Sequence, residues 1–330
     1  MKEVRGVYPH ANTVVCIEDG KLLKKFEYEI LFNAGGLHAA LYELNGINYF
    51  RTFINADEYN YNSLLDGLMG VTFSLMAEIA PNPLIYRMFA LYYDIHNIKL
   101  AVKERFTNRR FDDVFLSYGY YTLPTIRSAT VRESDDIFQN GILTAGLFEA
   151  LRSKDMYDCD FILDKTYLKC LKAFAADMGV PSIYHFVVEK IDLYNVSAYF
   201  QHTAVGSPEE YFKKSFSDQG SYAYGEWSKY TESGDVETAR SFPLWQKYRP
   251  VWQNAENRRV LFEEIDVLID NYLIGRTKMC KLIAFGVEPI CAYFYNKFME
   301  IKNIRILLAG KENGYETAEI TRRMRIPYEL

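Results

Sequence analysis

The chain has 330 residues, of which 49% are hydrophobic and 25% are charged, and its formal net charge is −5. A chain of this length can bury a large core and can form two or three domains of about 100–150 residues. Its mildly acidic balance, without a long basic run, excludes a general nucleic-acid-binding protein.

The five cysteines and the apolar runs indicate in which cellular compartment the protein is expected. The cysteines are odd in number and form no CxxC motif, which favours a reducing cytosol over a disulfide scaffold. The N-terminal apolar run is too short for a signal peptide. No stretch approaches about 18 uninterrupted apolar residues, so we predict no transmembrane segment of the chain's own.

Three long helices are predicted in chain order, each starting at a proline. The first runs from Pro83 to about Phe106, and similar segments start at Pro181 and Pro289. Proline is favoured in the first helical turn, and apolar residues then recur at mixed three- and four-residue spacing. The helices are expected to end near Asn108, within 206–208 and within 310–314. A shorter segment follows each, at 110–116, 208–216 and 315–324.

Few β-branched alternating runs occur, so the sequence predicts an all-α fold. The least regular stretch is 218–257, which is rich in Gly, Ser, Tyr and Trp. It is interpreted as a long connection or as an extended surface. We predict three tandem helical units, at 1–112, 113–214 and 215–330.

One pattern recurs in all three long helices. In each copy a proline lies 14 residues before an asparagine, and an acidic residue lies three residues before that asparagine. The period is about 100 residues, longer than in common helical solenoids, which favours tandem domains. The repeated residues are Pro83, Asp94 and Asn97, then Pro181, Asp192 and Asn195, then Pro289, Glu300 and Asn303.

The acidic residue and the asparagine stand at i and i+3, so they share one helix face. The asparagine amide can both donate and accept hydrogen bonds. We predict that it binds the end of a neighbouring helix while the carboxylate accepts backbone N–H groups. The alternative is that the three pairs face a shared binding surface.

Sequence signatures of catalysis are missing. No GxxxxGK[ST], GxGxxG, GxSxG or HExxH motif occurs in the 330 residues, and the five histidines are dispersed. Asp112-Asp113 and Asp135-Asp136 lack the third aspartate of the all-α isoprenoid enzymes. We predict no catalytic residue, no cofactor and no metal site.

The third copy and its tail carry a family signature. The matching residues are Phe285, Gly286, Glu288, Pro289, Ile290, Ala292, Tyr293, Glu300, Asn303, Arg305, Gly310 and Lys311. This pattern resembles the C-terminal signature of the C subunits of V-type and A-type ATPases and ATP synthases, which are equivalent to the d subunits of eukaryotic V-ATPases. The first two copies resemble the family's corresponding segments, so the resemblance covers about residues 83–325.

The resemblance implies three similar helical domains around a pseudo-threefold axis, which form a funnel. It implies a non-catalytic rotor subunit in the central stalk, which couples the shaft of the catalytic head to the membrane proteolipid ring. Its expected partners are the D- and F-type shaft subunits and that ring. Its expected place is the cytoplasmic face of the membrane, reached through partners only. The alternatives are a soluble helical scaffold or an all-α enzyme whose site the sequence does not reveal.

Overall fold

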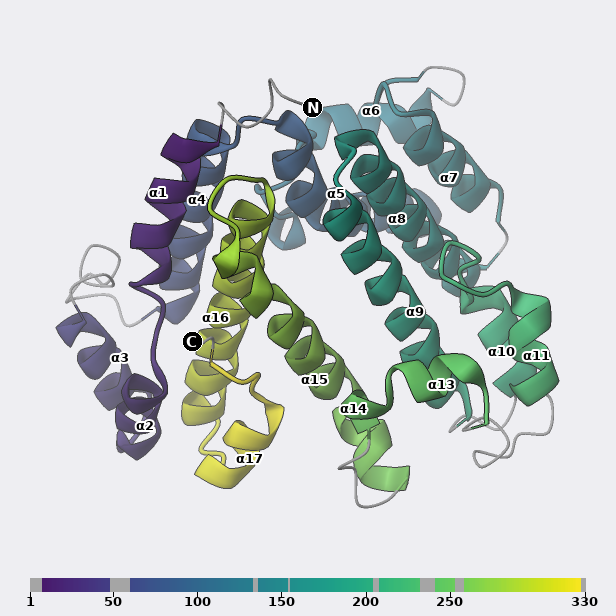
Figure 1. Ribbon diagram of the computed structural model, residues 1–330. Helices are drawn as coiled ribbons and strands as arrows, with labels where there is room; N and C mark the ends of the chain where they lie inside the picture. The colour runs from purple at the N-terminus through teal and green to yellow at the C-terminus, as the bar shows by residue number, and fades with distance from the viewer. Residues whose placement is uncertain are drawn as a thin grey trace. The chain divides into compact units, whose positions relative to one another are not determined.

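The computed structural model describes residues 8–47, 60–132, 136–153, 155–203, 208–231, 241–252 and 258–327. Every element assigned within these ranges is helical, which confirms the all-α class. The chain divides into two compact units (Figure 1), which we call the terminal unit (1–81 and 250–330) and the central unit (82–249). The expected boundaries near residues 112 and 214 stay a prediction.

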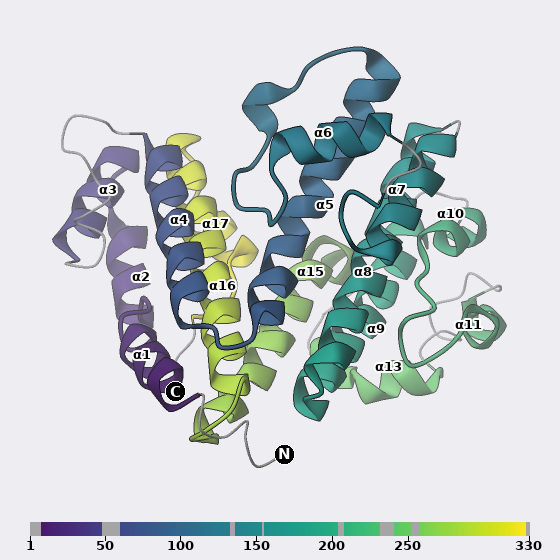
Figure 2. The ribbon, with the colours of Figure 1, turned by 90° about the horizontal axis from the view of Figure 1, so that it is seen from above.

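The terminal unit combines both ends of the chain. Its elements are α1 (Pro9–Asp19), α2 (Lys25–Asn33), α3 (Leu37–Gly46), α4 (Tyr61–Ile79), α15 (Arg258–Thr277), the 3₁₀ turn η3 (Lys278–Leu282), α16 (Glu288–Glu312) and α17 (Thr317–Arg323). Helix α16 packs against α1, α3 and α4 from the start of the sequence and against α15 and α17 from its end (Figure 2). It is therefore the core helix of this unit.

The central unit is continuous in sequence. Its elements are α5 (Pro83–Thr107), the 3₁₀ turn η2 (Asp112–Val114), α6 (Leu123–Val131), α7 (Gly141–Arg152), α8 (Met156–Met178), α9 (Pro181–Thr203), α10 (Pro208–Ser215), α11 (Tyr224–Thr231) and α13 (Pro243–Lys247). Helix α8 packs against α5, α7 and α9 (Figure 1). The short helix α14 (Arg249–Trp252) crosses the boundary between the units.

The first and third long helices begin and end within one residue of the predicted positions or inside the predicted range. In α5, Pro83 is the first residue and the Asn82 side chain accepts a hydrogen bond from the backbone N–H of Leu84. This pairing satisfies one of the four amide donors left open at a helix start. The helix ends at Thr107 because Asn108 adopts a left-handed conformation with φ of 51°. Gly206 and Ser207, the expected end of the second long helix, lie outside the described residues.

The segment 218–257 is more ordered than its composition predicts. Its described parts, 218–231 and 241–252, contain α11, α13 and α14. Trp227, Phe242 and Trp245 are buried, and Trp245 lies 5.1 Å from Phe200 between ring centroids. These aromatic residues therefore pack as core rather than form an extended surface. The helices have at most eight residues, too few to give a clear periodic pattern in the sequence.

Candidate functional site

The three repeated motifs lie on α5, α9 and α16, and their polar side chains are buried. Asp94, Asn97, Asp192, Asn195, Glu300 and Asn303 are each at most 5% exposed. Pro83 and Pro181 are the first residues of their helices, and Pro289 is the second residue of α16. Buried polar groups are costly unless they are hydrogen-bonded, so the partners of these side chains decide what the motif does.

Each asparagine holds both backbone groups of a single later residue. Its side-chain amide donates to that residue's carbonyl and accepts from that residue's N–H, as a neighbouring strand would. The donor and acceptor distances are 2.7 and 2.9 Å for Asn97 with Leu116, 2.9 and 2.9 Å for Asn195 with Ser217, and 2.9 and 2.8 Å for Asn303 with Arg325. We call each such pair, together with its acidic neighbour, an acid–asparagine clamp.

The clamped residue has the same position in every copy. It lies two residues beyond the end of the short helix that follows, namely η2, α10 or α17. Two hydrogen bonds to one peptide unit fix both the position and the rotation of the chain there. The clamps therefore fix the chain where each short helix ends, and this geometry favours the structural interpretation of the motif.

In the central unit the acidic residue accepts from the same returning chain. Asp94 Oδ1 accepts from the N–H of Tyr121 at 3.0 Å. Asp192 accepts from both the N–H and the hydroxyl of Ser221 at 2.6 Å, and from the hydroxyl of Tyr248 at 2.8 Å. Each carboxylate thus adds a second attachment a few residues after the asparagine contact.

Two glycines make this approach possible. A Cβ on Gly220 would lie 2.6 Å from Asp192 Oδ1, and a Cβ on Gly119 would collide with Asp94 Oδ1. Neither glycine has a positive φ, so the requirement is for space and not for an unusual backbone conformation. Sequence reasoning missed both residues, although 115–121 (FLSYGYY) and 216–222 (FSDQGSY) share Phe, Gly and Tyr at matching positions.

Burial has a clear electrostatic effect on Asp94. It raises the pKa of this carboxyl to about 7, since the charged form loses hydration. Hydrogen bonds from the backbone of Tyr121 and Tyr120, and the charge of Arg87, lower the pKa and offset part of this effect. A pKa of about 7 means that the charge of Asp94 changes near neutral pH.

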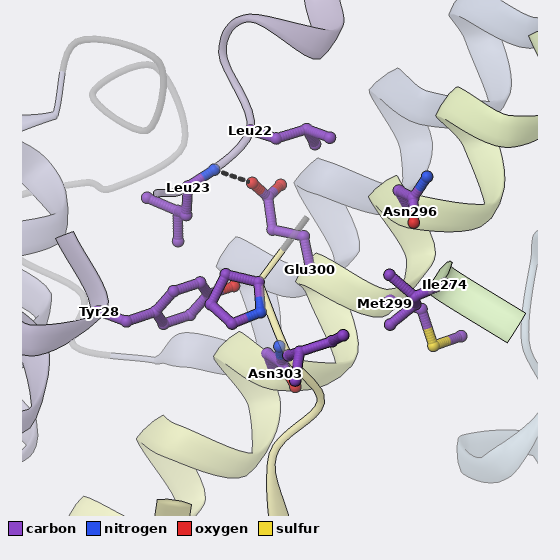
Figure 3. Close-up of a pocket in the computed structure, with 10 residues that line it drawn as sticks. Leu22, Leu23, Tyr28, Ile274, Asn296, Met299, Glu300 and Asn303 are labelled. Atoms are coloured by element: carbon purple, nitrogen blue, oxygen red, sulfur yellow. Dashed lines mark hydrogen bonds between the residues drawn. The ribbon is translucent and has the colours of Figure 1, made fainter. Parts of the chain in front are cut away.

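The clamp of the terminal unit has a different acidic contact (Figure 3). Glu300 Oε1 accepts from the N–H of Leu23 at 2.7 Å, across 277 positions of sequence. Its other oxygen pairs with Lys297, one turn earlier on α16, and both side chains are buried. This carboxylate therefore joins the linker between α1 and α2 to the core helix α16, a contact that the sequence repeat does not reveal.

The remaining signature residues have separate positions on α16 and the preceding loop. Lys311 Nζ donates to the carbonyls of Phe32 and Ala34 at 2.6 Å, at the C-terminal end of α2. A Cβ on Gly310 would lie 2.6 Å from Ile320 Cγ1, so α16 and α17 pack closely there. Phe285 and Arg305 are exposed. The signature therefore combines packing residues with surface residues.

Gly286 and Glu288, which also belong to the signature, contact one another. Glu288 stands at the start of α16, and its carboxylate packs over Gly286, where a Cβ would collide with Glu288 Oε2. An acidic residue in the first turn is favourable because of the helix dipole. This pair therefore shapes the entry of the chain into α16.

The cavity beside Glu300 is too small for a substrate. Its volume is about 10 Å³, room for one water molecule at most. Leu22, Leu23, Tyr28, Met299 and Asn303 line it (Figure 3). Small-molecule sites in proteins are typically some 300–1,000 Å³. This cavity is therefore a packing defect of the terminal unit.

Burial shifts the pKa of two of the described cysteines, Cys170 and Cys291. Burial raises the pKa of Cys170 to about 12 and also raises that of Cys291, so both thiols stay protonated at neutral pH. Within the described ranges, no cluster of three or more His, Cys, Asp or Glu side chains is arranged to hold a metal ion. Over the same residues, no helix is long and apolar enough to cross a membrane.

Comparisons with known proteins agree with the signature on α16. Residues 11–323 match the family described as ATP synthase (C/AC39) subunit. The C subunit of the V-type sodium ATPase of Enterococcus hirae is 21% identical, over 98% of this chain and 99% of its own length. The C subunit of the A-type ATP synthase of Methanocaldococcus jannaschii is 21% identical, over 95% of this chain and 85% of its own. That of Methanobrevibacter smithii is 23% identical, over 97% and 88%.

The family match includes the three motif helices and the α16 signature, so it covers all nine motif residues described above. Because it spans nearly the whole chain, the protein belongs to the ATP synthase (C/AC39) subunit family, whose members are non-catalytic subunits of the ATPase complex.

Proposed function

We propose that the protein is a central-stalk subunit of a V/A-type ATPase, which couples the shaft of the catalytic head to the proteolipid ring in the membrane. The observation that carries this proposal is the family match over residues 11–323, which includes all three motif helices. In this role the chain would transmit torque and perform no chemistry. Its partners would be the D- and F-type shaft subunits and the ring.

The clamps suit a part that carries mechanical load. A chain segment held by two hydrogen bonds to one peptide unit resists both sliding and rotation, and buried bonds are stronger than exposed ones. Close-packed helices transmit strain because protein interiors have low compressibility. We therefore propose that the nine motif residues, from Pro83 to Asn303, keep three similar helical domains rigid, arranged as a funnel around a pseudo-threefold axis.

The proposed location follows from the partners. We infer that the protein lies on the cytoplasmic face of the membrane and is held there by the other subunits. A complex of this kind would carry protons or sodium ions, driven by ATP hydrolysis or in the direction of ATP synthesis.

The first test is to tag the protein in its host, solubilise the membranes gently and identify the co-purifying proteins by mass spectrometry. We expect catalytic-head, shaft and proteolipid subunits together, and none of them from an untagged strain. Recovery of the chain alone, or with soluble proteins only, would contradict the proposal and favour the scaffold alternative.

The second test addresses coupling. Membranes from a strain that lacks the protein should lose ATP-driven ion uptake, and the full chain supplied in trans should restore it. Unchanged ion uptake in the deletion strain would show that the protein does not connect the head to the ring.

A further inference from the structure

The connection between α15 and α16 exposes three large apolar side chains, spaced three residues apart in the sequence. Met279 is 64% exposed, Leu282 is 77% exposed and Phe285 is 58% exposed. Met279 and Leu282 lie in the 3₁₀ turn η3, where residues three apart stand above one another. Phe285 follows three residues later in the sequence, after the turn has ended at the extended Ile283. We call Met279, Leu282 and Phe285 the η3 apolar row.

Basic residues accompany this row. Positions 278 and 281, one before each of the first two row residues, are both lysine, and Arg276 precedes them. Between residues 271 and 288 the only acidic residue is Glu288, whose carboxylate packs back over Gly286. The segment therefore combines exposed apolar groups with a local excess of positive charge.

The row stands on a fixed base. Before it, the buried Thr277 donates to the carbonyl of Ile274 at 2.7 Å and accepts from Asn296 on α16 at 3.0 Å. After it, Val287 is 1% exposed, and the side chain of Asn12 on α1 donates to the carbonyl of Ala284 at 3.1 Å. The exposed side chains are thus presented by a turn held at both ends.

We propose that the η3 apolar row inserts shallowly into an anionic lipid surface, with Lys278 on the headgroups. Apolar groups flanked by lysine and arginine suit the boundary between headgroups and acyl chains. Each cation near an anionic leaflet adds to the attraction. A stable protein interface occupies about 800 Å² on each partner, and three side chains are too few to cover that area.

The test uses the purified full chain and vesicles, so it does not depend on the proposed function. Binding is measured by co-sedimentation with phosphatidylcholine vesicles that contain about one-third phosphatidylglycerol, and with phosphatidylcholine alone. We expect binding to the anionic vesicles. It should weaken in about 1 M salt, where the Debye length is about 3 Å. Absent binding, or equal binding to both vesicle types, would overturn the proposal.

Substitutions test whether the η3 apolar row is the part of the protein that binds the vesicles. Met279→Ser with Leu282→Ser and Phe285→Ser should lower the partition coefficient at least roughly tenfold. Lys278→Ser alone should lower it roughly fivefold on anionic vesicles. The matched control replaces Ile17, Phe26 and Tyr42 by Ser, because these residues of the same unit are 60%, 60% and 76% exposed. Circular dichroism should show that all variants stay folded.

Two further outcomes would refute the assignment. If the control variant loses as much binding as the row variant, any exposed apolar group suffices and the row has no special role. If the row variant keeps vesicle binding but no longer co-purifies with a protein partner, the row is a protein contact and not a lipid contact.

Discussion

The clamps of the central unit take their backbone partners from the chain that follows them, whereas the clamp of the terminal unit takes one of its partners from the other end of the sequence. Asn97 and Asn195 reach 19 and 22 residues ahead, and Asn303 also reaches 22 residues ahead. The asparagine contact is therefore the same everywhere. Only the acidic contact differs, because Glu300 binds Leu23, 277 positions away.

This difference shows that the asparagine and the acidic residue of the motif make two kinds of contact. The asparagine contact is local, so it depends only on a long helix, a short helix and a returning chain. The carboxylate contact depends on whichever N–H group lies nearest: Tyr121 or Ser221 in the central unit, and Leu23 in the terminal unit. A glutamate replaces aspartate where the partner is not part of the same repeat.

The largest expected effect comes from removing the charge of Glu300. Glu300→Gln removes the carboxylate that pairs with the buried Lys297, and it weakens the hydrogen bond from the N–H of Leu23. Breaking a buried ion pair on one side costs about 3–5 kcal/mol. We expect the terminal unit to unfold at lower urea concentration, followed by hydrogen exchange of α1 and α16, while α5 and α9 keep their protection. A loss spread equally over both units would contradict the local role of this clamp.

Replacing a clamp asparagine should give the next largest effect. Asn195→Leu leaves the N–H and carbonyl of the buried Ser217 without these partners, a loss of about 2–4 kcal/mol in unfolding free energy. Asn97→Leu should lose less, because Leu116 is only partly buried. Thermal unfolding of the two variants measures the difference. Unchanged unfolding of both leucine variants would rule out the structural role.

Asp94 predicts a pH dependence confined to the central unit. Its pKa is about 7 in the folded protein against 3.8 for an unperturbed aspartate, so between these values the folded state binds more protons than the unfolded state. Stability from this group is therefore present at low pH and is lost as the pH rises from about 4 to 7, by about 3 kcal/mol. The difference between parent and Asp94→Asn in urea unfolding isolates it. A constant difference across that pH range would refute the prediction.

The smallest effect concerns the glycine beside Asp192. Gly220→Ala places a Cβ 2.6 Å from the carboxylate oxygen and should destabilise the central unit by about 1–2 kcal/mol, since the side chain must shift. Gly225→Ala in α11 is the control, because a Cβ there meets nothing within 4 Å. It should be neutral or stabilising. Thermal unfolding of the two variants tests the comparison. Equal melting temperatures would show that a Cβ close to the Asp192 carboxylate costs no unfolding free energy.

The sequence predicts the long helices well because their signals are local. Proline at the first turn, apolar spacing and Asn108 at the end together predict a helix from Pro83 to about Phe106, and the structure has Pro83–Thr107. The repeat of proline, acid and asparagine locates the three clamp helices from the sequence alone. These features depend only on neighbouring residues within one helix, so they can be recognised in the sequence.

The long-range contacts of the acidic residues depend on the tertiary fold, so the sequence does not predict them. Nothing near Glu300 in sequence points to Leu23, and the hydroxyl of Tyr248 reaches Asp192 from 56 positions away. The aromatic residues of 218–257 suggested a surface because their helices are too short to show a period. Only tertiary packing makes them core. By contrast, the glycines 119 and 220 stood in an aligned pattern that sequence reasoning could have used.

The contact between Leu23 and Glu300 also sets an order for biosynthesis. Residues 82–249 leave the ribosome as one continuous piece and can fold while the chain is still growing. The first 81 residues cannot complete their core then, since α16, which packs against α1, α3 and α4, is made only near the end of translation. Until translation ends, their apolar faces stay open to chaperones and proteases. Truncation just before residue 250 should therefore yield a folded central unit that carries an unfolded N-terminal extension.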